Sequence, residues 1–256
     1  RIQDKHVLHL IKMWLECAVE ETDDRGRKTR TTQARDKGRG IPQGSPISPL
    51  LANVYMRRFV LAWKKFGLER TLGSKIVTYA DDLVILCSKG KAEQALQKLR
   101  EIMGKLKLTV NEEKTRICRV PEETFDFLGY TFGRLYSPKT GKARIGMRPS
   151  KKSIKRMVEK VHELTDRKTS WQETTEVVGK LNRSLRGWAN YFKVGSDSGA
   201  YRALDNYTAS RLRWWLRFKY KLRNKKGGSY PLPHLYGHFG LVRLSARGRE
   251  QAWAKA

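Results

Sequence analysis

The adjacent acids Asp81 and Asp82 are the feature of this sequence that points most directly to chemistry. They interrupt residues 76–86, a run that otherwise reads as two short apolar strands rich in β-branched residues. If the strands pair as a hairpin, the acids lie at its tip, where they stay hydrated while the flanks are buried. Two like charges this close repel each other, and a bound divalent cation relieves the repulsion. Beside a polynucleotide, such a cation would serve phosphoryl transfer.

An Asp-Asp pair between hydrophobic runs is more often an ordinary surface turn, so the charge of the whole chain matters. The 256 residues include 54 Lys and Arg against 25 Asp and Glu, a formal net charge of +29. Such an excess favours a polyanion as partner, most commonly nucleic acid. An anionic membrane surface is the alternative, but no apolar stretch is long enough to span a bilayer and no signal peptide opens the chain. We therefore expect no membrane partner.

The basic charge is concentrated in the second half of the chain. Residues 131–256 carry 29 basic and 8 acidic side chains, whereas residues 1–130 carry 25 and 17. The second half is thus the stronger candidate for binding a polyanion. With 39% hydrophobic residues the chain can bury a sizeable core, and its length suggests two compact units.

The cysteines and histidines do not indicate a disulfide framework or a zinc site. The three cysteines are far apart and form no Cys-x-x-Cys pair, which fits a reducing compartment. Cys87 and Cys118 lie in apolar contexts and are interpreted as small core residues. His234 and His238 have ligand-like spacing but no partner cysteines, so we interpret them as loop or surface residues.

The first half alternates helical and strand patterns. Residues 22–39 are polar and basic, typical of a hairpin or loop, and residues 40–49 form a turn-rich connector. Apolar residues at helical spacing predict helices over 2–19, 50–63 and 91–106. Short strands are expected around 108–110, 116–120 and 125–132.

The character of the sequence changes near residue 145. Ser150 is placed to cap a helix with an apolar face running to Leu164, and residues 170–173 have a capping-box pattern that would open a second helix. A third helix is predicted over 198–223. Three successive amphipathic helices favour a small bundle.

The order of motifs resembles the palm of reverse transcriptases. A Pro-Gln-Gly segment with a following helix precedes Tyr79-Ala-Asp-Asp82, and a Lys-bearing segment and Phe127-Leu-Gly-Tyr130 come after it. Residues 42–55 have the sequence Pro-Gln-Gly-Ser-Pro-Ile-Ser-Pro-Leu-Leu-Ala-Asn-Val-Tyr. This sequence resembles the corresponding segment of the bacterial group II intron reverse transcriptases, also called maturases. Residues 181–192, Leu-Asn-Arg-Ser-Leu-Arg-Gly-Trp-Ala-Asn-Tyr-Phe, resemble the thumb, or maturase, region of that family.

The resemblance implies a role for each matching residue in RNA-directed DNA polymerisation. Asp81 would bind both catalytic Mg²⁺ ions and Asp82 would assist. Lys114 would protonate the pyrophosphate leaving group, although an ordinary solvated lysine explains it equally well. The nucleotide and primer would be contacted by Gln43, Gly44, Tyr79, Ala80, Leu128 and Gly129. The reaction would be a two-metal in-line displacement on deoxynucleoside triphosphates, with an RNA template and a DNA primer.

The thumb would also bind group II intron RNA. Residues 211–226 contain eight basic and no acidic residues, interleaved with aromatics. Leu212, Trp215 and Leu216 suit a core face, and Trp214 or Tyr220 could stack on bases, although core packing explains any single aromatic as well. The side chains expected to contact RNA are Arg183, Arg186, Arg211, Arg213, Arg217, Lys219, Lys221 and Arg223.

One departure from the family pattern concerns the metal site. The family places a further metal-binding aspartate in a strand upstream of the first predicted helix, and Asp4 lacks the apolar strand context for that role. We therefore expect that the fingers and first palm segment are missing and that this chain alone does not polymerise. A split protein with a separate N-terminal polypeptide and a fragment of a longer chain are both open.

Other functions stay open. The chain could be a non-catalytic RNA-binding splicing factor in which the palm is a scaffold. A diversity-generating or defence-associated reverse transcriptase would share the palm, but the match at residues 181–192 weighs against it. No endonuclease motif is evident near the C-terminus.

The expected fold class is α+β. A partial reverse-transcriptase palm of antiparallel strands with helices (1–145) would precede an all-α three-helix thumb or maturase domain (146–226) and a C-terminal tail (227–256). The resemblance places the protein in a ribonucleoprotein in the bacterial cytoplasm.

Overall fold

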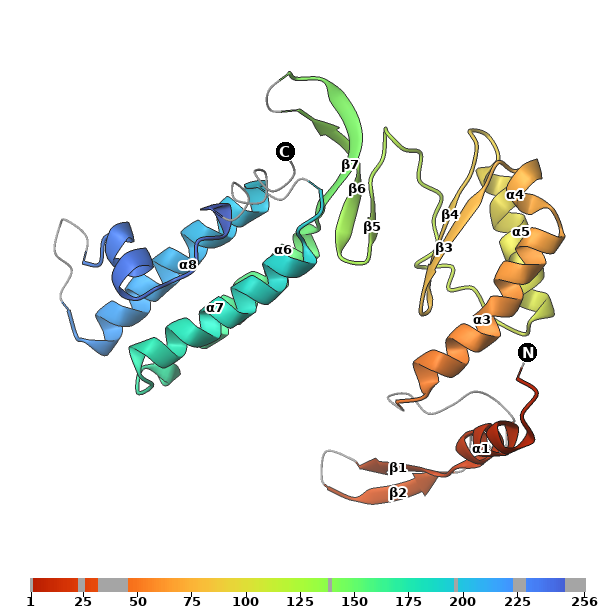
Figure 1. Ribbon diagram of the computed structural model, residues 1–256, viewed down its shortest axis with the longest axis horizontal. Coiled ribbons are helices and arrows are strands. Elements are labelled where there is room, and N and C mark those ends of the chain that lie inside the picture. The colour runs from red at the N-terminus through yellow and green to blue at the C-terminus, as the bar shows by residue number, and fades with distance from the viewer. Residues whose placement is uncertain are drawn as a thin grey trace. The chain divides into compact units, whose positions relative to one another are not determined.

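The computed structural model describes residues 2–22, 26–31, 46–137, 140–195, 198–222 and 229–246 (Figure 1). Its contacts divide the chain into two compact units, residues 1–117 and 118–256. Helices accompany three small antiparallel sheets, which confirms the expected α+β class. The domain limits after residues 145 and 226 stay predictions. No helix of the described ranges combines the length and apolar character that crossing a bilayer requires.

The first unit begins with helix α1 (Lys5–Glu16), which Asp4 caps by accepting hydrogen bonds from the backbone N–H groups of His6 and Val7. Strands β1 (Val19–Thr22) and β2 (Lys28–Thr31) then pair antiparallel, so the described part of the polar segment expected to be a hairpin or loop belongs to a hairpin. Residues 23–25 and 32–39 of that segment lie outside the described residues. Helix α3 (Ser48–Lys65) has a proline in its first turn, where a missing N–H leaves no helical hydrogen bond unmade. The remaining elements are α4 (Leu68–Thr71), β3 (Lys75–Tyr79), β4 (Asp82–Leu86) and α5 (Ala92–Lys105).

The core of the first unit lies where α3 and α5 meet. Phe59 and Trp63 of α3 are fully buried, and Trp63 donates its indole N–H to the hydroxyl of Ser74 at 3.0 Å. Ser74 in turn donates to the carbonyl of Leu68, so this buried polar pair is satisfied. Helix α5 contributes Ala95, Leu99, Ile102 and Met103. Cys87 packs against this core, and burial raises the pKa of its thiol.

Two of the predicted strands are wrong. Residues 108–110 and 116–120 form no strand in the structure. Leu108 and Val110 pack against the first core, so burial accounts for their apolar character. A segment becomes a strand only where a neighbour completes its backbone hydrogen bonds, and neither segment pairs with another within the described ranges.

The second unit opens with a three-stranded sheet in the order β5-β6-β7. Strands β5 (Phe125–Phe127), β6 (Tyr130–Tyr136) and β7 (Ala143–Pro149) are antiparallel. The loop between β5 and β6 has two residues, Leu128 and Gly129, with φ of 48° and 77°. A two-residue loop with both φ values positive matches the twist of a hairpin.

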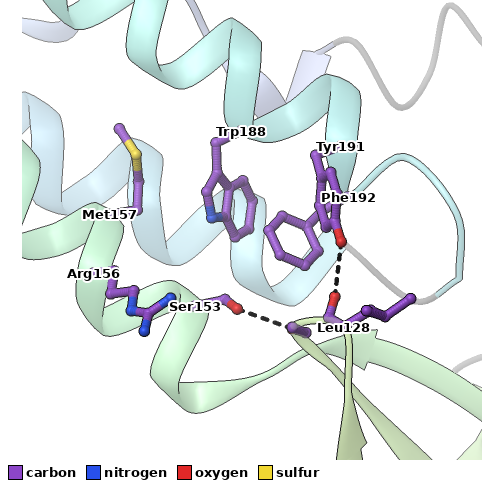
Figure 2. A pocket seen from close by; sticks show the side chains of 8 residues that line it. Leu128, Ser153, Arg156, Met157, Trp188, Tyr191 and Phe192 are labelled. Carbon is purple, nitrogen blue, oxygen red and sulfur yellow. Dashed lines mark hydrogen bonds between the residues drawn. The ribbon is translucent and has the colours of Figure 1, made fainter. Parts of the chain in front are cut away.

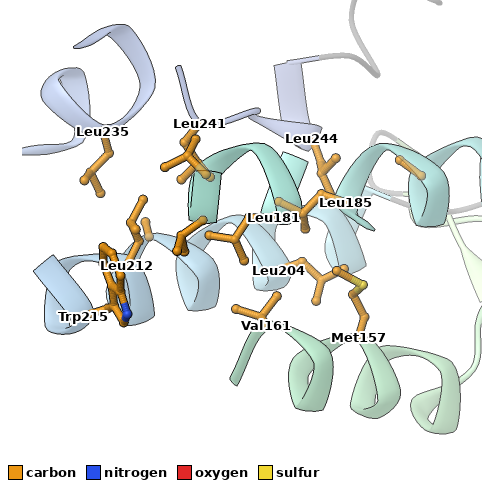
Figure 3. Packing of buried hydrophobic residues seen from close by; sticks show 14 of the residues in the cluster. Met157, Val161, Leu181, Leu185, Leu204, Leu212, Trp215, Leu235, Leu241 and Leu244 are labelled. Carbon is orange, nitrogen blue, oxygen red and sulfur yellow. The ribbon is translucent and has the colours of Figure 1, made fainter. Parts of the chain in front are cut away.

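Three long helices follow this sheet, as predicted. Ser150 caps α6 (Lys151–Leu164) by accepting from the N–H of Ser153, and α7 (Thr174–Tyr191) and α8 (Ser198–Lys219) complete the set. Figure 3 shows their buried side chains interleaved. Leu212, Trp215 and Leu216 are fully buried, which confirms the predicted core face of α8.

The predicted capping box at residues 170–173 is wrong. Helix α7 begins at Thr174 after Glu173, which makes no side-chain cap hydrogen bond. Ser170 instead ends a short 3-10 helix, η1 (Arg167–Thr169), that Asp166 caps. Because Lys219 donates to the carbonyls of Ser170 and Gln172, tertiary contacts hold this segment outside the helix.

The C-terminal segment is built into the core of the helical unit. It contains η2 (His234–His238), a short π-helix, and its side chains Leu235, Leu241 and Leu244 are almost fully buried against the three helices (Figure 3). The rings of His234 and His238 stack at 4.5 Å between centroids.

Candidate catalytic turn and nucleic-acid surface

Asp81 and Asp82 lie at the tip of the β3–β4 hairpin, as the sequence predicts. The register pairs Tyr79 with Asp82, so Ala80 and Asp81 form the two-residue loop. Ala80 has a φ of 51°, a left-handed conformation that costs an L-residue about 1 kcal/mol.

The hairpin has one face on the core and one open face. Ile76, Leu83 and Ile85 pack against the first core. Because side chains alternate along a strand, Tyr79 and its partner Asp82 share the opposite face. Tyr79 is 63% exposed, so this face presents an aromatic ring beside a carboxylate.

The two carboxylates are available to bind a cation. Both residues are exposed, and neither forms an ion pair with another described residue. Carboxylate oxygens are the ligands Mg²⁺ prefers, and one or two of them commonly suffice when substrate phosphates supply the rest. Among the described residues, however, no group of three or more His, Cys, Asp or Glu side chains is assembled for a metal. The hairpin therefore offers a partial set of ligands.

Lys114 is exposed on a turn that follows α5. Its backbone N–H donates to the side-chain oxygen of Asn111 at 3.1 Å. Glu112 in the same turn accepts two hydrogen bonds from Arg100 of α5, at 2.9 and 2.6 Å, and hydrogen bonding by Arg100 lowers the pKa of the Glu112 carboxyl. These bonds fix the turn that carries the Lys114 side chain.

The Leu128–Gly129 turn is bonded to the helices of its own unit. The hydroxyl of Tyr191 donates to the carbonyl of Leu128 at 3.0 Å. The carbonyl of Gly129 accepts from the backbone N–H of Ser150 and from the hydroxyl of Ser153. The turn predicted to contact the primer is thus held rigidly by α6 and α7. Gln43, Gly44 and Arg223 lie outside the described residues.

The basic side chains predicted to contact RNA fall into two groups. Arg211, Arg213 and Lys219 donate to carbonyl oxygens of the protein, at distances of 2.8–3.1 Å. These three side chains tie α8 to neighbouring segments. The remaining side chains form no hydrogen bond or ion pair with another described residue: Arg183, Arg186, Arg217 and Lys221.

An exposed aromatic pair lies on α8. Trp214 and Phe218 stack at 6.1 Å with an interplanar angle of 14°. The guanidinium of Arg167 lies over both rings, and that of Arg211 lies 4.6 Å from the centroid of Trp214. Tyr220, by contrast, shares a hydrogen bond with Thr174, 3.1 Å away. A cationic, flat surface of this kind suits the face of a base.

The residues that hold the Leu128–Gly129 turn could not be recognised from the sequence. Tyr191 lies within the motif at residues 181–192, and Ser153 lies one turn after the predicted cap. Nothing in the local sequence of either residue predicts its contact with the turn, which is 63 positions away for Tyr191 and 24 for Ser153. Arg167 was missed because its partners lie on a different helix.

Comparison with known proteins fits this geometry. Residues 2–132 match the reverse transcriptase (RNA-dependent DNA polymerase) family, and residues 154–230 match the maturase-specific domain of group II introns. The first match covers just over half of the chain, so the protein belongs to the reverse transcriptase family, and the second gives it the maturase domain of group II intron proteins.

A relative from Saccharomyces cerevisiae, described as a putative COX1/OXI3 intron 1 protein, is 30% identical over 36% of this chain. The matched part spans only 17% of the length of that relative. The match is a similarity to one short part of that relative, and no property of the relative is carried over to this chain.

Proposed function

We propose that this chain supplies the metal-binding turn and the thumb of an RNA-directed DNA polymerase that works with a group II intron RNA. The observation that carries the proposal is the hairpin tip, where two exposed carboxylates without ion pairs stand beside an exposed tyrosine. The family membership supports the reaction, and the net charge of +29 supports a nucleic-acid partner.

In this proposal Asp81 and Asp82 hold Mg²⁺ through their carboxylate oxygens. Mg²⁺ held there would supply activation of the primer 3′-hydroxyl and neutralisation of charge on the triphosphate. Tyr79 and Ala80 line the nucleotide site from the same tip, and Lys114 lies on a fixed turn from which its ammonium could donate a proton. Leu128 and Gly129 approach the primer, and Gln43 and Gly44 the nucleotide and template.

The thumb binds intron RNA in a ribonucleoprotein. Arg183, Arg186, Arg217 and Lys221 are the side chains best placed to contact phosphates, because the protein itself does not use their donors. Trp214 and Phe218 provide a stacking surface. Arg211, Arg213 and Lys219 contribute mainly by holding α8 in place, since their donors meet backbone carbonyls.

The metal assignment is tested by titrating Mn²⁺ and following paramagnetic broadening of backbone amide signals by NMR. Broadening should centre on residues 79–83 and disappear in Asp81→Asn. Glu69→Gln, which removes another exposed carboxylate of the same unit, should leave it unchanged. Broadening that persists in Asp81→Asn would show that the metal binds elsewhere.

Primer extension with Mg²⁺ on an RNA template tests the reaction itself. It should be measured for the wild-type chain and for Asp81→Asn, and the substitution should abolish it. The non-catalytic splicing factor is the second candidate, and the match of residues 154–230 to the maturase-specific domain of group II introns favours it. It predicts salt-sensitive RNA binding and splicing assistance without extension under any of these conditions.

A further inference from the structure

A pocket of about 400 Å³ lies where the Leu128–Gly129 turn meets α6 and α7. Figure 2 shows its walls: the turn closes one side, α6 contributes Arg156 and Met157, and α7 contributes Trp188 and Phe192. All of these residues belong to the second unit. The volume falls in the range typical of sites for small organic ligands.

A buried hydrogen-bond donor without a partner among the described residues lies behind the wall of the pocket. The indole N–H of Trp188 is inaccessible to solvent and bonds to no acceptor among the described residues. The Trp188 ring is fixed by Phe192 at 4.6 Å and by Tyr201 at 6.0 Å between centroids, and its nitrogen edge faces the Met157 side of the pocket (Figure 2). An unsatisfied buried donor is costly, so a ligand that offered it an acceptor would gain binding energy. Because Met157 is flexible, its side chain can move to admit one.

The two backbone carbonyls of the turn beside the pocket already accept hydrogen bonds from the protein. The carbonyl of Leu128 accepts from Tyr191, and the carbonyl of Gly129 accepts from Ser153, whose only hydroxyl hydrogen is thereby committed. The polar groups left over are therefore donors: the indole N–H and the guanidinium of Arg156. A ligand that suits this pocket must bring acceptors, not donors.

Arg156 gives the mouth of the pocket a positive charge. It is exposed and forms no ion pair with any described residue. Lys152 lies one helical turn earlier on the same face of α6 and is likewise unpaired within the described ranges. An aromatic interior behind a guanidinium matches a flat base attached to a phosphate.

We infer that this pocket binds a single unstacked nucleotide of an RNA strand. The base would pack against the rings of Trp188 and Phe192 and displace the Met157 side chain, with a ring nitrogen or carbonyl oxygen accepting from the indole N–H. Its phosphate would meet Arg156 at the mouth. The inference rests on the proposed RNA-binding function and adds to it a site that selects unpaired over paired positions, because a base within a duplex cannot reach the pocket.

The test compares two short RNA duplexes that differ only by one unpaired adenine. Binding of each to the full chain is measured by fluorescence anisotropy at one salt concentration. The wild-type protein should prefer the bulged duplex, and Trp188→Phe and Arg156→Gln should each reduce that preference roughly tenfold, the loss expected for one hydrogen bond to a buried or charged group. The matched controls are Trp171→Phe, at a residue that is 77% exposed, and Lys151→Gln, which removes one charge from the same helix; both should keep the preference.

The thermal midpoint gives a readout that a purely structural role for Trp188 would not produce. Because Trp188→Phe removes an unsatisfied donor while keeping an aromatic ring, the free protein should unfold at the same temperature or higher. If Trp188→Phe fails to fold, the effect of Arg156→Gln on the preference for the bulged duplex still tests the proposed nucleotide site.

The outcomes separate this inference from the function on which it depends. Equal affinity of the wild-type protein for both duplexes would overturn the proposed nucleotide site, and so would an unchanged preference in Trp188→Phe and Arg156→Gln. In either case, salt-sensitive binding of the paired duplex would still support the RNA-binding function. Absence of any RNA binding would overturn both. Wild-type protein that bound adenosine 5′-monophosphate as tightly as the bulged duplex would assign the pocket to free nucleotides and overturn the inference as stated.

Discussion

Asp205 in the middle of α8 accepts a hydrogen bond from the backbone N–H of Leu244 at 2.8 Å, and a second one from the adjacent Ser245 at 2.9 Å. A similar clamp lies nearby on α7, where Asn182 donates to the carbonyl of Gly240 and accepts from the N–H of Val242. The two polar side chains therefore hold the C-terminal segment across the helices, while Leu241 and Leu244 enter the core.

Replacing Asp205 should destabilise the helical unit. The carboxylate is 5% exposed, and Asp205→Ala leaves the N–H of buried Leu244 without its partner, so we expect a loss of about 2–3 kcal/mol in the free energy of unfolding. Urea denaturation measures it. Glu159→Ala on the exposed face of α6 should change the free energy by no more than about 0.5 kcal/mol, because its ion pair with Lys155 is solvated. Equal effects of the two substitutions would refute the clamp.

Glycine at position 129 is needed for two separable reasons. Gly129 has a φ of 77°, and an added Cβ would lie 2.9 Å from the Ser153 hydroxyl and 3.2 Å from the Phe192 ring. Gly141→Ala is the matched control, because Gly141 has a φ of 66° but open space around it. We expect about 1 kcal/mol of destabilisation at Gly141 from the backbone alone and a clearly larger loss at Gly129. If thermal unfolding shows equal losses, the turn is not packed against the helices.

Some arginines of the thumb should contribute to RNA binding and others to the stability of the fold. The double variant Arg183→Gln/Arg186→Gln should lower the slope of log affinity against log salt by about 1.5 for single-stranded RNA, one phosphate contact being lost per arginine. Its thermal midpoint should not move, since neither side chain bonds to the protein. Arg211→Gln should instead lower the thermal midpoint, because the Arg211 guanidinium donates hydrogen bonds to Thr165. A stable Arg211→Gln variant with a reduced salt slope would reverse the assignment.

The Arg100–Glu112 pair should make the Lys114 turn sensitive to acid. The pKa of Glu112 is lowered in the folded protein, chiefly by its hydrogen bond from Arg100. A lowered pKa means that the interaction is present above the ordinary glutamate pKa, about 4.3, and is lost as the pH falls through the folded value. NMR titration of the Glu112 carboxyl should show this, and in Arg100→Gln the pKa should return to its ordinary value. An unchanged titration in that variant would show that Arg100 is not the cause.

Much of this protein could be predicted from local patterns. The Asp81–Asp82 hairpin, the cap at Ser150 and the apolar face of α8 were all predicted correctly, because periodicity and capping depend on residues a few positions apart. The strands predicted at 108–110 and 116–120 are absent from the described structure, because strand formation depends on residues far apart in the sequence. Strand formation needs a partner for the backbone, and no local pattern supplies one.

The sequence alone determined the excess of positive charge, the order of the elements and the motifs from which the chemistry is proposed, all of which are properties of residue type and spacing. Only the tertiary structure decided which basic groups are committed to the protein and which are free, since Arg211 and Arg186 look alike in sequence and differ only in what lies beside them. It also decided that the Leu128–Gly129 turn docks on α6 and α7 and leaves the indole N–H of Trp188 unpaired. Packing between distant segments sets both results, because a side chain's hydrogen-bond partners depend on what lies near it in space.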